Sequence, residues 1–217
     1  MGINTIIDHT LLKPEASEDQ IKKLCQEAID YEFFSVCVNP TWIETAREVL
    51  KGSPVKIATV IGFPLGANSL ETKVFESKDA LDKGAHEIDM VINIGALKSK
   101  NYDQVKNEIQ AVKKAIGDHI LKVIIETCLL TEEEKKKASQ LVVEAGGDFV
   151  KTSTGFSTAG AQVEDVRLIR SVVGDKAKIK ASGGIRDYEK ARAMVEAGAD
   201  RLGVSAGLAI LEGENHA

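Results

Sequence analysis

The chain has 217 residues, of which 43% are hydrophobic and 28% charged, and its formal net charge is −5. This composition predicts one soluble globular domain, and the lack of a basic block argues against nucleic acid or an anionic membrane as a partner. Cys25, Cys37 and Cys128 form neither a CxxC pair nor a His-flanked cluster, so no disulfide framework or metal site is indicated. Reduced thiols and an N-terminus unlike a signal peptide favour a cytoplasmic protein.

Short runs rich in valine and isoleucine alternate with longer amphipathic segments along the chain. The runs predict eight strands, near 5–8, 34–38, 56–61, 87–93, 121–127, 149–152, 178–181 and 201–204. The segments between them predict helices over 17–31, 41–51, 70–83, 103–116, 131–145, 164–173 and 187–197. Ser17 with Gln20, and Thr131 with Glu134, indicate capping boxes at two helix starts. Strand–helix alternation implies parallel strands, and eight units predict an α/β fold, a single closed (β/α)8 TIM barrel over residues 1–217.

A weak repeat marks three junctions between a predicted helix and the next strand. Each junction contains a glycine that is suited to a left-handed helix stop, and these are Gly84, Gly146 and Gly198. The positions five residues later are Asp89, Lys151 and Gly203. Equal offsets predict that these three lie at similar depth near the carboxyl ends of their strands, which is the catalytic face of a barrel.

Two lysines stand at the ends of apolar strand-like runs. Lys151 ends the run from residue 148, and Lys180 precedes Ala-Ser-Gly-Gly. Burial lowers the pKa of a lysine, a second ammonium lowers it further, and the neutral amine can attack carbonyl carbons to start Schiff-base chemistry. Lys178 is the rival for the second lysine because it lies on the same side of the strand, but Lys180 is nearer the predicted mouth. The alternatives are a lysine that reaches solvent and a structural lysine paired with an acid.

Two aspartates are candidates for work beside these lysines. Asp89 lies inside an apolar strand, so we expect it to pair with a lysine, to move protons as a carbinolamine becomes an imine, or both. Asp8 ends the first predicted strand and could bond a substrate hydroxyl, hold a lysine or cap a turn. His9 is expected to pack without a chemical role. Cys37 is expected to be a small core residue that matters only if it faces the mouth.

The loops after the last two predicted strands are candidates for binding phosphate. Barrels often use these two loops and a short helix that follows, here expected over 206–211, because glycines admit the ligand and helix-end N–H groups donate to it. A glycine pair also serves as a plain turn, so the prediction depends on both loops together. The candidates are Gly155, Gly183, Gly184, Gly203, Ser205 and Gly207.

Seven runs, from the first predicted strand to the last but one and the loop after it, carry a resemblance to a known family. They are DHTLLK at 8–13, SVCVNP at 35–40, VIGFPLG at 60–66, EIDMVIN at 87–93, LKVIIET at 121–127, FVKTSTGF at 149–156 and KASGGIR at 180–186. Together they resemble the short form of the deoxyribose-phosphate aldolases, which are class I Schiff-base enzymes. The resemblance implies a (β/α)8 barrel that cleaves 2-deoxy-D-ribose 5-phosphate reversibly to D-glyceraldehyde 3-phosphate and acetaldehyde, in deoxyribose catabolism.

The resemblance also implies roles for particular residues. The family's Schiff-base lysine, second lysine, proton-relay aspartate and further mouth aspartate fall on Lys151, Lys180, Asp89 and Asp8. Some longer members carry a lysine near the phosphate where this chain has Phe156, which leaves Arg186 and the backbone loops for that group. No metal and no organic cofactor are implied. The implied partners are phosphosugar and aldehyde substrates and further copies of the chain, as a homodimer or larger homo-oligomer.

Other functions remain compatible with the same residues. One is another Schiff-base aldolase of this fold, transaldolase-like or acting on a bisphosphate, which a test of acetaldehyde as donor would separate. A second is an isomerase or synthase barrel with the same phosphate loops and no imine, which failed borohydride trapping would favour. A third is a phosphosugar-binding barrel without catalysis, against which the set of Lys151, Lys180 and Asp89 argues.

Overall fold

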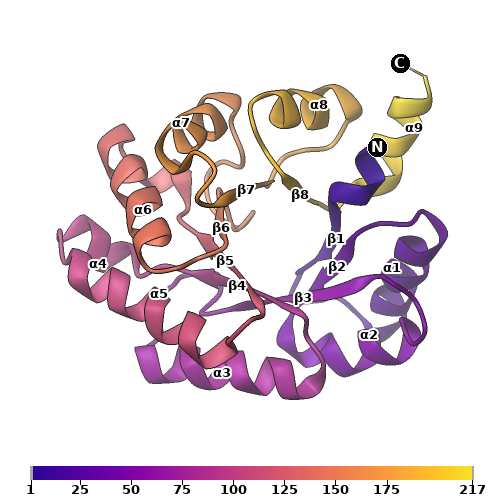
Figure 1. The fold of residues 1–217 in the computed structure, drawn as a ribbon. Coiled ribbons are helices and arrows are strands. Elements are labelled where there is room, and N and C mark those ends of the chain that lie inside the picture. Colours follow the sequence, from indigo (N-terminus) through magenta and orange to yellow (C-terminus); the bar gives the residue numbers. More distant parts are fainter. Residues whose placement is uncertain (1, 217) are drawn as a thin grey trace.

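Eight parallel strands alternate with helices and close into a barrel in the computed structural model, which describes residues 2–216 (Figure 1). Each strand pairs with the next one in the chain, and the last pairs with the first. The strands are β1 Ile7–Leu11, β2 Ser35–Val38, β3 Lys56–Ile61, β4 Glu87–Val91, β5 Ile120–Ile124, β6 Phe149–Lys151, β7 Lys178–Ser182 and β8 Arg201–Val204. The predicted (β/α)8 barrel is confirmed.

The helices surround the barrel, and both ends of the described chain lie beside each other (Figure 1). At that place the backbone N–H of Ile3 donates to Oε1 of Glu214 at 3.2 Å. The α-helices are α1 Glu18–Asp30, α2 Ile43–Val49, α3 Leu70–Lys83, α4 Ile94–Lys98, α5 Tyr102–Ile116, α6 Glu132–Glu144, α7 Val163–Val173, α8 Tyr188–Glu196 and α9 Gly207–Asn215. The 3₁₀ turns are η1 Ile3–Ile6, η2 Pro40–Trp42 and η3 Thr127–Leu129.

Local signals in the sequence mark several of these boundaries correctly. Both predicted capping boxes are present, at the starts of α1 and α6. The three junction glycines all have left-handed backbones, with φ of 116° at Gly84, 81° at Gly146 and 112° at Gly198. Short polar side chains and glycine act through the nearest backbone groups, so their effect can be read without knowing the fold.

Other boundaries differ from the prediction for identifiable reasons. The first strand begins at Ile7 because η1 takes residues 3–6, and the first two residues of the expected helix 41–51 belong to η2. β4 ends at Val91, since the side chain of Asn93 accepts a backbone N–H and caps α4. β5 ends at Ile124, because Glu126 has a left-handed φ of 55°. The sequence analysis misses α4, whose five residues are too few to show a helical period.

Alternate residues of the strands pack on opposite sides of the barrel wall. Ile88 and Met90 of β4, with Leu121 and Val123 of β5, belong to the large apolar core. The residue between each pair, Asp89 or Lys122 respectively, makes its ion pairs with charged side chains of other strands. Part of the barrel interior is therefore charged, whereas most such barrels fill it with branched apolar residues. Within residues 2–216, no helix combines the length and the apolar character that crossing a membrane requires.

Candidate active site

Lys151, the last residue of β6, is a buried lysine with one carboxylate partner. Its side chain is 3% exposed, and Nζ donates to Oδ2 of Asp89 at 2.7 Å. Burial lowers the pKa of Lys151; Asp89 acts in the opposite direction, and the positive charge of Lys180 adds to the lowering. The net direction is downward, which increases the fraction of neutral, nucleophilic amine at a given pH.

Lys180 lies beside Lys151 in the register of β7 on β6 but has a different environment. Its Nζ is 2.5 Å from Oδ2 of Asp8 and 2.8 Å from Oδ2 of Asp89. Burial alone would lower the pKa of Lys180, but these two carboxylates outweigh burial and raise it. The pKa values of two neighbouring buried lysines thus shift in opposite directions: Lys151 loses its proton more readily than an ordinary lysine, and Lys180 holds its proton more firmly.

Gly203 of β8 makes room for this second lysine. A side-chain carbon at Gly203 would lie 2.9 Å from Cε of Lys180, closer than real contacts of that kind. Lys178, the rival candidate in the sequence analysis, begins β7 and is exposed, with its Nζ 5.8 Å from the ring centre of Phe149. The structure brings Lys180, and not Lys178, to Asp89.

Asp89 connects three lysines from three strands. It accepts hydrogen bonds from Lys122 at 2.8 Å, Lys151 at 2.7 Å and Lys180 at 2.8 Å. Burial alone would raise the pKa of Asp89, but the three ammonium groups hold it well below its usual range. Asp8 behaves similarly: Lys180, Lys122 and Arg201 lower its pKa against the effect of burial. Both predicted aspartates are therefore ionised and paired.

Three charged residues of this cluster are absent from the sequence-based candidates. Lys122 of β5 is fully buried and contacts Glu87 as well as Asp89. Nη1 of Arg201 donates to Oδ1 of Asp8 at 2.8 Å and to Oε2 of Glu87 at 3.3 Å. Lys122 carried a readable signal, a charge between two apolar strand residues. Glu87 and Arg201 begin their strands, where charged side chains usually reach solvent, so no local signal marks them.

A cavity of about 400 Å³ opens above this cluster at the carboxyl ends of the strands. Lys151 and the loops after β6, β7 and β8 line it together. The candidates from the sequence that line it are Lys151, Gly155, Gly183, Gly184, Arg186, Gly203 and Ser205.

Two other candidates are not among the residues that line this cavity. Gly207 is buried at the start of α9, where a side-chain carbon would lie 2.8 Å from the ring of Phe33. Cys37 is fully buried in a small apolar cluster with Leu12, Ala58 and Val60. Burial raises the pKa of its thiol. Gly207 is not among the residues that line the cavity, and its contact with phosphate stays a prediction. Cys37 matches the expected small core residue.

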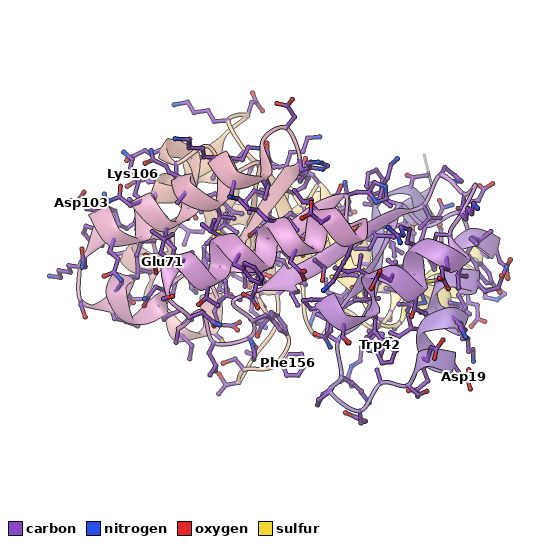
Figure 2. All side chains as sticks on the ribbon, turned by 90° about the horizontal axis from the view of Figure 1, so that it is seen from below. Asp19, Trp42, Glu71, Asp103, Lys106 and Phe156 are labelled. Carbon is purple, nitrogen blue, oxygen red and sulfur yellow. The ribbon has the colours of Figure 1, made fainter. Side chains whose placement is uncertain are left out.

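The loop that follows Lys151 is held by a residue that the sequence analysis missed. Glu126 is buried, and its carboxylate accepts from the backbone N–H of Thr154 at 3.2 Å and from the Thr154 hydroxyl. Oγ1 of Thr154 in turn accepts from the N–H of Phe156 at 3.0 Å. The ring of Phe156 meets that of Phe63 edge-on at 5.3 Å, at the outer edge of the molecule (Figure 2). These contacts fix the loop on both sides of Gly155.

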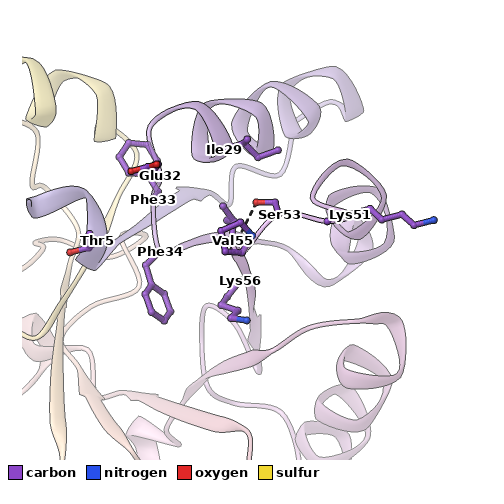
Figure 3. Close-up of a pocket in the computed structure, with 11 residues that line it drawn as sticks. Thr5, Ile29, Glu32, Phe33, Phe34, Lys51, Ser53, Val55 and Lys56 are labelled. Atoms are coloured by element: carbon purple, nitrogen blue, oxygen red, sulfur yellow. Dashed lines mark hydrogen bonds between the residues drawn. The ribbon is translucent and has the colours of Figure 1, made fainter.

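A larger cavity, of about 680 Å³, lies at the opposite end of the barrel (Figure 3). Its lining includes Phe33, Phe34, Ser53, Val55 and Lys56. Its lining does not include the predicted site residues Asp8, Asp89, Lys151 and Lys180. Among residues 2–216, no three histidine, cysteine, aspartate or glutamate side chains converge so as to hold a metal ion.

Known aldolases match this chain both in sequence and in fold. Residues 4–213 match the family described as DeoC/LacD family aldolase. The chain is 64% identical to the deoxyribose-phosphate aldolase of Streptococcus sanguinis (strain SK36), over 99% of this chain and 97% of the relative. An aldolase named QR15 superposes with a TM-score of 0.95 at 44% identity, covering 99% and 96% of the two chains. The tetrameric deoxyribose phosphate aldolase of Aeropyrum pernix gives 0.90 at 33% identity, covering 98% and 91%. The chain belongs to the DeoC/LacD family of aldolases.

Proposed function

We propose that this protein is a deoxyribose-phosphate aldolase, which cleaves 2-deoxy-D-ribose 5-phosphate reversibly to D-glyceraldehyde 3-phosphate and acetaldehyde in deoxyribose catabolism. The observation that carries the proposal is the position of Lys151, a buried amine of lowered pKa that lines the same cavity as the glycine loops after β7 and β8. Identities of 60–64% to relatives of that name, over nearly the whole chain, support the substrate.

The first half of the reaction forms the imine. The neutral amine of Lys151 adds to the aldehyde carbon C1 of the open-chain sugar, and the former carbonyl oxygen takes a proton. Loss of that oxygen as water then gives the protonated imine. Asp89 accepts hydrogen bonds from Lys151 at 2.7 Å and from Lys180 at 2.8 Å, so Asp89 and Lys180 are the groups we assign to these proton transfers. A positioned acid or base is worth roughly 10²–10⁴-fold in rate.

The second half breaks the carbon skeleton. Acetaldehyde keeps C1 and C2, so the C2–C3 bond breaks: the C3 hydroxyl loses its proton, C3 becomes the aldehyde of glyceraldehyde 3-phosphate, and the electron pair moves into the imine to give an enamine. Protonation of the enamine at C2 and addition of water to the imine release acetaldehyde and restore Lys151. The loops around Gly183, Gly184 and Ser205, with Arg186, are the groups we assign to the phosphate.

Reductive trapping tests the proposal directly. The folded protein is treated with borohydride in the presence of acetaldehyde, and its peptides are mapped by mass spectrometry. We expect a reduced two-carbon adduct on Lys151, none in a Lys151→Met variant, and an unchanged adduct in Lys178→Met, whose lysine is exposed. An adduct on Lys180 would reverse the roles of the two lysines. No adduct on the folded protein would favour an isomerase or a binding barrel.

We also propose that the protein works in the cytoplasm as a homo-oligomer. Cys25, Cys37 and Cys128 are all free, which suits a reducing compartment. Leu65 is 74% exposed and Phe75 is 70% exposed, and the relative from Aeropyrum pernix is described as a tetramer. Size-exclusion chromatography with light scattering should give a mass at least twice 23.4 kDa. A monomer at micromolar concentration would contradict the oligomer.

A further inference from the structure

The charged cluster inside the barrel has an unequal number of positive and negative groups. Within the described chain it contains three carboxylates and four cationic side chains, joined by ion pairs from β1, β4, β5, β6, β7 and β8. The members are Asp8, Glu87, Asp89, Lys122, Lys151, Lys180 and Arg201. All are at most 6% exposed, so water does little to balance their charge. With every group ionised, the cluster carries one net positive charge.

The contacts determine which cation gives up its proton most readily. Lys122 lies within 4 Å of three carboxylates, Lys180 of two and Arg201 of two, whereas Lys151 pairs with Asp89 alone. Arginine does not deprotonate in proteins. Removing one proton from the cluster therefore costs the least free energy at Lys151, because this ammonium has the fewest carboxylate partners.

Arg201 makes no ion pair with Lys151 or Asp89, and its charge is permanent. The guanidinium carbon of Arg201 lies 3.5 Å from the ring centre of Phe34. Phe34 also lines the cavity of about 680 Å³ at the opposite end of the barrel (Figure 3). In the strand register Lys151 pairs with Lys180, and Lys180 pairs with Arg201. Two strand spacings separate the first from the third, about 10 Å at the backbone. Arg201 and Lys151 have no carboxylate in common, so Arg201 acts on Lys151 through space and through Lys122 and Lys180, each of which contacts both Asp8 and Asp89.

We infer that Arg201 is a positioning residue for the reaction: its positive charge, with those of Lys122 and Lys180, balances the three carboxylates, so that the cluster is neutral when the amine of Lys151 is free. Without Arg201, the cluster would be neutral when Lys151 is protonated. This inference rests on the proposed function, because it assumes that Lys151 is the nucleophile.

The remaining charged groups near the cluster do not change the count. Cys37 of β2 faces it as a thiol whose pKa is raised by burial, so it stays neutral. Lys56 and Lys178 are the first residues of β3 and β7, and both side chains are exposed at the amino-terminal ends of these strands. The directions of the pKa shifts agree with the count: despite burial, carboxylates raise the pKa of Lys122 and Lys180, whereas burial lowers that of Lys151.

The test measures the protonation of Lys151 in charge variants of its distant partner. In Arg201→Met, we expect the acidic limb of the pH profile of kcat/KM, and that of the rate of borohydride trapping with acetaldehyde, to move up by about one pH unit. This corresponds to about a tenfold loss of free amine on the acidic side of the limb. Arg201→Lys keeps the charge, so its limb should stay near that of the parent.

Removing a negative charge from the cluster distinguishes an electrostatic role of Arg201 from a purely structural one. Glu87→Gln removes one negative charge, so the limb should move down, and the double variant Arg201→Met with Glu87→Gln should bring it back to the parent position. A merely structural role for Arg201 would lower the rate at every pH and leave the limb in place in all variants. Unmoved limbs in folded variants that still form the adduct overturn the inference. If the parent protein forms no adduct, the proposed function fails first.

Discussion

At the scale of single residues, the number of partners distinguishes the two lysines that the sequence placed together. Lys151 pairs with one carboxylate and Lys180 with two, although they are neighbours in the sheet register and both are buried. Two buried lysines at matching strand positions therefore differ in pKa, which is lowered for Lys151 and raised for Lys180. The difference comes from Asp8, which reaches Lys180 from β1, six strands earlier in the chain.

Replacing Lys180 by Met should affect both the rate and its pH dependence. The variant loses the proton-transfer group beside the imine, so we expect kcat to fall roughly 10²–10⁴-fold. It also loses a positive charge next to Lys151, so the pKa of that amine should rise. Single-turnover kinetics across pH measure both effects. An acidic limb that remains at its original pH would contradict the tuning of Lys151 by Lys180.

At the scale of elements, the loop after β6 depends on a residue of the loop after β5. Glu126 adopts a left-handed backbone, which is uncommon for a residue other than glycine, and this conformation accompanies its two hydrogen bonds with Thr154. The two loops therefore act as one unit around Gly155. Strain of this kind persists only where the surroundings hold it, and it is frequent at functional sites.

Replacing Glu126 by Ala should loosen this unit. The buried N–H and hydroxyl of Thr154 would lose their acceptor, which should lower the free energy of unfolding by about 1–3 kcal/mol. The KM for the phosphorylated sugar should rise more than the KM for acetaldehyde, since the loop lines the proposed phosphate side of the cavity. Urea denaturation and steady-state kinetics measure these effects. Glu126→Gln keeps one acceptor oxygen and should fall between the parent and Glu126→Ala.

A buried ion pair joins the helical layer to the barrel. Nζ of Lys73 in α3 is 2.7 Å from Oε2 of Glu108 in α5 and also donates to the carbonyls of Gly66 and Val91. Burial lowers the pKa of Lys73, and Glu108 opposes that change. This single side chain connects two helices, the end of β4 and the loop after β3.

Replacing Lys73 by Met should leave the carboxylate of Glu108 buried without its cation. We expect a loss of about 3–5 kcal/mol in the free energy of unfolding, measured by chemical denaturation. The double variant Lys73→Met with Glu108→Leu removes both charges and should recover a large part of the loss. A double variant as unstable as the single one would show that the backbone contacts of Lys73, rather than its ion pair, hold these elements.

At the scale of the whole molecule, closure of the barrel determines how stability responds to acid. Asp8 of β1 and Asp89 of β4 both have a lowered pKa: buried lysines lower the pKa of each, and Arg201 also lowers that of Asp8. A carboxylate with a lower pKa in the folded state contributes stability that is fully present above its unfolded value, about 3.9, and is lost as the pH falls through the folded value.

The free energy of unfolding should therefore decrease as the pH falls below about 4, with proton uptake on unfolding. Urea titrations at several pH values give the slope. A variant with Asp89→Asn should show a smaller slope than the parent, because one of the two depressed carboxylates is gone. An equal slope in both proteins would mean that other carboxylates dominate acid unfolding.

The sequence by itself determined the barrel, the two capping boxes, the glycine helix stops and the candidates Lys151, Lys180 and Asp89. These features act through neighbouring backbone groups, or they appear as a charge inside an apolar run, and neither requires distant residues. The shifted ends of β4 and β5 also have local causes, in Asn93 and Glu126, but those side chains resemble ordinary loop residues in the sequence.

Only the tertiary structure decided which charges meet. Glu87 and Arg201 begin strands four units apart, yet closure of the sheet brings their side chains within 3.3 Å of each other. Contacts across a closed barrel depend on strand tilt and register, which are set by all eight strands together. The protonation of Lys151 depends on that complete set of charges, so the sequence could identify the lysine but not the groups that balance it.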